Sequence, residues 1–318
     1  MALFLTENDV KQVLTATMAL EAVESAHRDL ALGQAQDTPR ARTRLPQTVL
    51  HILQGALPAQ GVLGYKAYTS NRSGNRFLVH LFDAATGSLL AVIEADYMGM
   101  IRTGAASGVA AKWLARPETR VAGVFGAGWQ AEGHVRAICA AVPLERVKVF
   151  SRNREKLDDF CRRMSETTGV AVVPAASAEE TVRDSGLVGT VTTAAQPLFD
   201  AEWLAPGAHI NAAGSNALIR QELSEATLRR CALIAVDAVP TALAEAGDLL
   251  PLLEKGRLHA RQLVELGDII VGKHGGRSAA EQVTVFESQG MAIQDLAVGL
   301  RVLAAARERG MGVELPLK

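Results

Sequence analysis

The chain has 318 residues, of which 48% are hydrophobic and 21% are charged, a composition typical of a soluble globular protein with a large core. The 33 lysines and arginines nearly balance the 34 aspartates and glutamates, so the net charge of −1 points neither to a nucleic acid nor to a membrane as partner. Because no apolar run could span a bilayer and no signal-peptide pattern opens the chain, we expect a cytoplasmic protein.

The N-terminal third changes from helical to strand-like patterning. Thr6 followed by Asp9 is typical of a capped helix start, and a second helix is predicted over residues 18–32, with Gly33 just beyond its end. Over residues 42–94, short β-rich runs separated by Gly, Pro and Asn predict an antiparallel meander. Small residues over 96–115 then favour a closely packed helix, which ends before Pro117.

A glycine-rich turn follows the next predicted strand, residues 121–125. It reads Gly126-x-Gly128-x-x-Ala131, passes into an apolar helical pattern, and a second β-run follows at residues 147–150. Glycines at these positions permit a tight turn and the close approach of a pyrophosphate, while the helix N-terminus offers unpaired N–H groups. The pattern predicts a dinucleotide-binding βαβ unit; a chance glycine turn is the alternative.

The residues after that second strand bear on the choice of cofactor. An acidic residue there accepts from the ribose of NAD, but this chain has Ser151 and Arg152, with Arg154 close by. Either arginine could bind the 2′-phosphate of NADP, so NADP is the preferred cofactor and NAD the alternative. The arginines could instead be a solvated helix start.

Strand and helix patterns alternate through the rest of the middle of the chain. Strands are predicted at 170–173, 187–191, 208–212 and 233–236, and helices at 178–183 and 222–229. This alternation predicts an α/β fold, a Rossmann-type doubly wound parallel sheet over residues 117–289. A long closing helix over 290–309 could return to residues 1–116 and complete an α+β substrate-binding and dimerisation domain with an antiparallel sheet. Neither the three cysteines nor the seven histidines show metal-ligand spacing, so no metal site is expected.

Several motifs together resemble the ornithine cyclodeaminase/μ-crystallin family, and the resemblance covers nearly the whole chain. The motifs, in order, are Arg42-x-x-x-Pro46, Gly64-Tyr-Lys66, Ile101-Arg102-Thr103, Gly126-Ala-Gly128-Trp-Gln130, Gly214-Ser-Asn216 and Ser288-x-Gly290. The resemblance implies a homodimer that acts on a small amino or imino acid. It also implies that the N-terminal domain, completed by the C-terminal helix, supplies the substrate site and the dimer interface.

The resemblance carries roles to particular residues. Arg42 and Arg102 would hold the substrate carboxylate, since guanidinium groups recognise it at two points, and Lys66 would bond to the carboxylate or the reacting nitrogen. Arg42 lies in a basic run that could equally be a solvated face. The cofactor contacts would be Gly126, Gly128, Trp129, Gln130, Ser151, Arg152, Thr103, Thr192 and Ser288.

Asn216 departs from the family pattern. Cyclodeaminases and alanine dehydrogenases of the family have an aspartate here for proton transfer, whereas Asn cannot ionise and can only form hydrogen bonds. The sequence therefore favours NAD(P)H-dependent reduction of a preformed imine, such as pyrroline- or piperideine-2-carboxylate. The alternatives are an ornithine cyclodeaminase with catalytic NAD, and a non-catalytic NADPH-binding protein.

Overall fold

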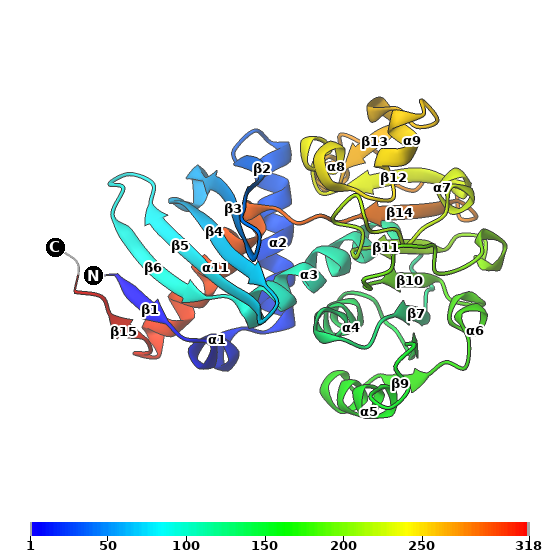
Figure 1. Cartoon of the computed structure of the whole chain (residues 1–318), viewed down its shortest axis with the longest axis horizontal. Coiled ribbons are helices and arrows are strands. Elements are labelled where there is room, and N and C mark those ends of the chain that lie inside the picture. The colour runs from blue at the N-terminus through cyan, green and yellow to red at the C-terminus, as the bar shows by residue number, and fades with distance from the viewer. Residues whose placement is uncertain (1, 317–318) are drawn as a thin grey trace. The chain divides into compact units, whose positions relative to one another are not determined.

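The computed structural model describes residues 2–316, which form two compact units. The first unit combines the residues up to Arg102 with those from Gly290 onward, and the second is Thr103–Gln289 (Figure 1). The first junction falls within helix α3 (Asp96–Leu114), and the second lies at residue 290. Within the described residues, no helix is both long and apolar enough to cross a membrane.

A seven-stranded sheet forms the centre of the first unit, in the order β15-β1-β6-β5-β4-β3-β2. The predicted meander is confirmed, because β2 to β6 pair antiparallel with their neighbours. β1 joins parallel to β6, so the two ends of the chain complete this sheet. The strands are β1 (Leu3–Leu5), β2 (Gln36–Arg44), β3 (Thr48–Leu57), β4 (Val62–Asn71), β5 (Gly74–Asp83), β6 (Leu89–Glu94) and β15 (Val313–Glu314).

Three further helices belong to this unit: α1 (Glu7–Val13), α2 (Ala16–Ala31) and α11 (Ala292–Glu308). α11 contacts β3, β4 and α2, so the closing helix does return to the first domain (Figure 1). Glycines allow this close packing, since a Cβ at Gly55 would lie 3.0 Å from Ile293 and one at Gly64 would lie 3.0 Å from Leu296. The expected capping box at Thr6 and the left-handed Gly33 (φ +71) are also present.

The second unit is built on an eight-stranded sheet in the order β13-β12-β14-β11-β10-β7-β8-β9, with every pair parallel. From β7 the chain first builds outward through β8 and β9, and then returns to place β10 on the other side of β7. In such sheets ligands bind beyond the carboxyl ends of the strands at this reversal. The strands are β7 (Val121–Phe125), β8 (Arg146–Phe150), β9 (Ala171–Pro174), β10 (Leu187–Thr190), β11 (His209–Ala212), β12 (Cys231–Val236), β13 (Leu263–Glu265) and β14 (Val283–Glu287).

Helices cover both faces of this sheet, as the predicted doubly wound fold requires. Two apolar clusters result, one that includes Val124, Val135 and Phe160 and one that includes Phe125 and Val285. The helices are α4 (Trp129–Ala141), α5 (Leu157–Thr168), α6 (Ala178–Val182), α7 (Glu225–Arg230), α8 (Val239–Glu245), α9 (Leu250–Glu254) and α10 (Leu266–Ile270).

Candidate functional site

Three charged side chains meet inside the first unit. Lys66 on β4 and Arg102 on α3 are only 4% and 6% exposed, and both contact Asp295 on α11, which is completely buried. Lys66 Nζ lies 3.1 Å and Arg102 Nε 2.9 Å from the same oxygen, Asp295 Oδ1. One carboxylate is therefore the counterion of two buried cations, so the cluster of Lys66, Arg102 and Asp295 has a net positive charge.

Neighbouring groups fix the guanidinium of Arg102. Its Nη1 donates to Gln294 Oε1 over 3.0 Å, and Gln294 Nε2 in turn lies 3.1 Å from His27 Nε2 on α2. Gly290 presses on the same group, because a Cβ there would lie 2.6 Å from Arg102 Nη1. These contacts orient the guanidinium plane, which two-point recognition of a carboxylate requires.

The ammonium group of Lys66 has a lowered pKa. Burial, first, and then the charge of Arg102 lower its pKa to about 8, although Asp295 opposes both. Phe77 lies beside the ammonium, with its ring centroid 5.3 Å from Nζ. Near neutral pH this lysine is mostly protonated but gives up its proton more readily than a solvated lysine does.

Arg42 lies on the same face of the sheet as Lys66. It is opposite His51 on β3, and His51 is opposite Tyr68 on β4. Tyr68 is two residues from Lys66, and side chains alternate along a strand, so these groups share one face. The segment is strand β2 rather than a freely solvated basic run, and Arg42 is half-buried.

The charge of this arginine row is evident at His51. Burial and then Arg40, Arg42 and Arg44 lower the pKa of His51 to about 4, so the imidazole is neutral at physiological pH. Its ring stacks on Tyr68 at 4.2 Å. A flat, partly aromatic wall with cationic groups on one side suits a small, flat anion.

In the second unit, the turn after β7 has the backbone that a dinucleotide needs. Gly126 has φ +113, and a Cβ there would lie 2.6 Å from the carbonyl oxygen of Val191, so a larger residue does not fit. Gly128 is the N-cap of α4 and has no side-chain cap, while a Cβ on it would meet nothing within 4 Å. Open space in front of uncapped N–H groups fits a pyrophosphate.

The residues expected beside this turn are accessible. Trp129 is 42% exposed and Gln130 is also exposed, at the first two positions of α4. Ser151 and Arg152 follow β8, and Arg152 is exposed. Arg154, the other arginine considered for a 2′-phosphate, donates to the carbonyls of Ala175 and Ala176.

The remaining predicted residues lie at other strand ends or on α3. Thr192 follows β10, and its hydroxyl donates to Glu222. Asn216 is exposed in the turn that follows β11. Ser288 follows β14, is buried and donates to Asp237. Thr103 is a half-buried residue of α3.

Sequence reasoning missed Asp295. Its signal was an acidic residue among the apolar positions Ile293, Leu296 and Val298 of the predicted helix, because a charge placed there needs a buried partner. Lys66, in an apolar strand, carried the complementary signal. Within the described residues no group of three or more His, Cys, Asp or Glu is arranged to hold a metal ion.

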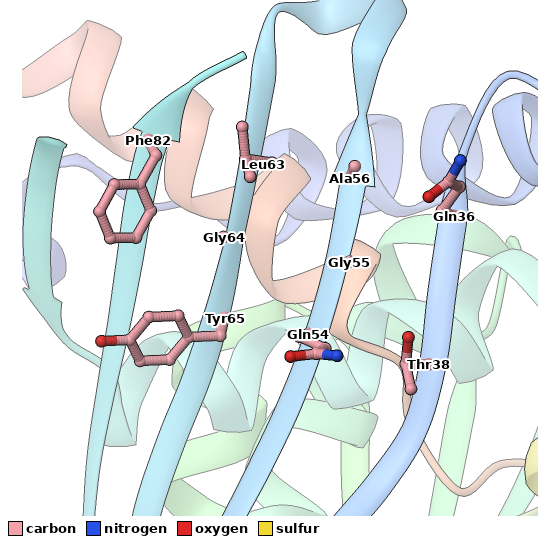
Figure 2. A pocket seen from close by; sticks show the side chains of 9 residues that line it. All are labelled: Gln36, Thr38, Gln54, Gly55, Ala56, Leu63, Gly64, Tyr65 and Phe82. Atoms are coloured by element: carbon pink, nitrogen blue, oxygen red, sulfur yellow. The ribbon is translucent and has the colours of Figure 1, made fainter. Parts of the chain in front are cut away.

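A cavity of about 300 Å³ lies on the opposite face of the first unit's sheet (Figure 2). Tyr65 and Leu63 point into it from β4, with Phe82 from β5, while α11 lies behind the strands. None of the predicted site residues lines this cavity, so it is separate from the Lys66 cluster.

The parallel sheet of the second unit, with a glycine-rich turn at its reversal, defines a dinucleotide-binding protein, and the first unit with its buried cations makes it a two-part member of that class. The chain belongs to the ornithine cyclodeaminase/mu-crystallin family, whose model matches residues 1–310.

Individual relatives agree with this membership. The chain is 35% identical over 283 residues to the delta(1)-pyrroline-2-carboxylate reductase of Bacillus cereus, covering 85% of this chain and 87% of that protein. The structure of the Thermococcus litoralis delta(1)-pyrroline-2-carboxylate reductase, in complex with NADH and L-proline, matches with a TM-score of 0.93 at 28% identity, covering 98% of this chain and all of that one. An archaeal alanine dehydrogenase dimer with bound NAD also matches, with a TM-score of 0.93 at 31% identity, covering 100% and 99%.

Proposed function

We propose that this protein is an NAD(P)H-dependent reductase that converts a small cyclic α-imino acid, such as pyrroline- or piperideine-2-carboxylate, into the amino acid. The observation that carries the proposal is the buried cluster in which Lys66 and Arg102 share Asp295. It combines a carboxylate-binding group with a proton donor of suitable pKa. The likeness to pyrroline-2-carboxylate reductases supports the same chemistry.

Arg102 and Arg42 bind the substrate carboxylate. Arg102 is held in a fixed plane by Asp295 and Gln294, and Arg42 stands on the same sheet face as Lys66. The carboxylate of an α-imino acid is bonded to the carbon that accepts hydride, so holding it fixes that carbon. The neutral His51 and Tyr68 provide an apolar wall for the ring.

Lys66 donates the proton that the imine nitrogen needs. With its pKa lowered to about 8, the ammonium is charged at neutral pH and yet acidic enough to transfer a proton. Asp295 keeps it oriented through Oδ1, while the buried Oδ2 has no donor among the described residues. That oxygen accepts the N–H of the protonated imine.

Asn216 favours reduction over cyclodeamination. It stands in the exposed turn after β11, where it orients the substrate nitrogen through hydrogen bonds but cannot remove a proton. Ornithine cyclodeamination requires oxidation of an amine and loss of ammonia before the reduction, so it needs a base that this position does not supply.

The cofactor binds at the Gly126–Gly128 turn, with Trp129 and Gln130 beside its pyrophosphate. When bound, the reduced nicotinamide supplies the hydride that adds to the α-carbon. Thr103, Thr192 and Ser288 lie along the nicotinamide half. Arg152, exposed beside Ser151, binds the 2′-phosphate, which makes NADPH the preferred cofactor.

The functional form is a homodimer assembled through the first unit. The dimeric alanine dehydrogenase that matches this chain supports that assembly. The molecular mass of the present protein in solution, measured by light scattering, tests whether it forms a dimer.

Loss of reduced-cofactor absorbance with either cyclic imine is the direct test. The wild-type protein should oxidise NADPH faster than NADH, whereas Lys66→Met should abolish turnover and leave NADPH binding, followed by fluorescence, unchanged. Retained turnover in Lys66→Met would remove Lys66 from the chemistry. Ammonia released from ornithine with NAD would identify a cyclodeaminase, and tight NADPH binding with no turnover of any imine would identify a binding protein.

A further inference from the structure

Among the described residues of the second unit, four acids have no exposed surface: Asp237, Glu222, Asp248 and Glu287. The last three hold neighbouring turns of the sheet, and the proposed chemistry uses none of them. Glu287 is the last residue of β14 and pairs in register with Ala212, the last residue of β11. The group therefore lies at the carboxyl edge of the sheet, the edge at which ligands of such folds bind.

Glu222 ties two turns of that edge together. Its Oε1 accepts from the backbone N–H of Thr192 over 2.6 Å and from the Thr192 hydroxyl over 2.7 Å. Its Oε2 accepts from the N–H of Gly214 over 2.8 Å. A Cβ at Gly214 would lie 2.5 Å from this carboxyl group, so only glycine permits the contact. One side chain thus fixes the turn after β10 to the turn after β11.

Asp248 and Glu287 accept hydrogen bonds from the segment that follows Gly214. Asp248 Oδ1 accepts from the N–H groups of Glu222 and Leu223, at 2.8 and 3.0 Å. Glu287 Oε2 accepts from the Ser215 hydroxyl at 3.1 Å. Ser215 lies between the two acids, because its carbonyl accepts from the N–H of Gly247, the neighbour of Asp248, over 2.7 Å while its hydroxyl donates to Glu287. Asp248 Oδ2 and Glu287 Oε1 are both buried, and neither has a donor among the described residues. Two carboxyl groups can share a hydrogen bond only when one of them carries a proton.

The surroundings of Glu287 favour the protonated form. Burial first, and then the negative charge of Asp248, raise the pKa of Glu287 well above 4.5, and Glu222 adds to this. The other groups that face it are the Ser215 hydroxyl, the Gln289 amide and the Cys231 thiol, none of which is a cation.

We propose that Glu287 carries a proton at neutral pH and donates it to Asp248, and that this pair, together with Glu222, holds the Gly214–Ser215–Asn216 turn where Asn216 meets the substrate. The role of Asn216 rests on the proposed function. Glu222, Asp248 and Glu287 are positioning residues, since they act through the turn. Loss of the shared proton places two negative charges side by side beneath the turn and loosens it.

Amide substitutions test the shared proton directly. Gln at position 287 can donate to Asp248 and accept from Ser215, so Glu287→Gln reproduces the protonated form, and Asp248→Asn keeps one donor between the pair. The double variant has two facing amide donors. At neutral pH we expect Glu287→Gln to have a Tm at or above that of the wild type and Asp248→Asn to remain near it, whereas the Tm of the double variant should fall below the sum of the two single effects. Additive effects would overturn the proposal.

The pH dependence of Tm provides a second test. A raised native pKa favours folding at low pH, and this contribution is lost as pH rises above the ordinary value of 4.5. Glu287→Gln should therefore gain Tm relative to wild type as pH rises above about 4.5. Asp237→Asn is the control for removal of another buried carboxyl group at this edge of the sheet, because Asp237 accepts from Ser288 and Gln289. A constant Tm difference for Glu287→Gln would contradict a shared proton.

Kinetics separate positioning from simple stabilisation. Above the pKa of the pair, KM for the imine in the wild type should rise by about tenfold per pH unit, whereas Glu287→Gln should show no such rise. NADPH affinity should change in neither protein. If KM rises equally in both, the pair does not position Asn216. If no imine is turned over, the proposed function fails while the two Tm tests still decide the shared proton.

Discussion

Replacing Asp295 by Asn isolates the charge that supports the Lys66 cluster. The amide keeps the size and shape of the carboxyl group but removes the negative charge that Lys66 and Arg102 share at 3.1 and 2.9 Å. Both cations then remain buried without a counterion, and the charged form of Lys66 becomes much less favourable.

The size of the effect follows from the burial of the pair. Removing one partner of a buried ion pair costs about 3–5 kcal/mol. At about 1.4 kcal/mol per pH unit, this lowers the pH at which Lys66 loses its proton by about two pH units or more. The wild-type pKa is about 8, so the lysine changes from mostly charged to mostly neutral at neutral pH. Imine reduction needs the charged form, so kcat at neutral pH should fall at least about tenfold.

The assay is the pH profile of kcat with a cyclic imine and saturating NADPH. In the wild type kcat should decline as pH rises through about 8, and in Asp295→Asn this decline should occur at lower pH. Asp37→Asn is the matched control, since Asp37 accepts from the N–H of Ile293 near the start of the same helix and lies outside the ion pairs that Lys66 and Arg102 form with Asp295. It should lose about 1 kcal/mol of stability with an unmoved profile. An alkaline decline that stays near pH 8 in Asp295→Asn would refute the reasoning.

Two further substitutions use matched controls. Arg152→Ala should raise KM for NADPH about tenfold and leave KM for NADH unchanged, because it removes one charge-assisted contact. The control Arg154→Ala should lower Tm, because it removes hydrogen bonds to the carbonyls of Ala175 and Ala176. Equal effects of Arg152→Ala on both cofactors would exclude a 2′-phosphate site at Arg152. Gly290→Ala should cost about 1–2 kcal/mol for its positive φ and also raise KM for the imine by displacing Arg102. Gly61→Ala has a similar φ and nothing within 4 Å, so it should lose stability alone, and an equal change in KM would contradict the contact.

The parts of the fold that could be predicted are those with local signals. The glycine turn at Gly126, the cap at Thr6 and the helix end at Gly33 each depend on a few adjacent residues, and all three have the expected backbone. The alternation of strands and helices was likewise sufficient to predict a parallel sheet, since a strand buried on both faces is apolar throughout.

The parts that could not be predicted depend on contacts between distant residues. Lys66 and Asp295 are 229 positions apart, so nothing near either residue indicates its partner. Arg154 illustrates the same limit, because only the folded chain brings the carbonyls of Ala175 and Ala176 within its reach. β2 was obscured because two arginines, Arg40 and Arg42, occupy half-buried positions, so that in sequence the strand is indistinguishable from a solvated segment.

The interrupted course of the first unit has a consequence for biosynthesis. Its strands from β1 to β6 are made early, but α11, which carries Asp295, is made only after all of residues 103–289. On the ribosome the second unit is a continuous segment and can fold first, whereas Lys66 and Arg102 lack their counterion until α11 emerges. The sheet of the second unit can therefore be completed before the Lys66–Arg102–Asp295 cluster forms.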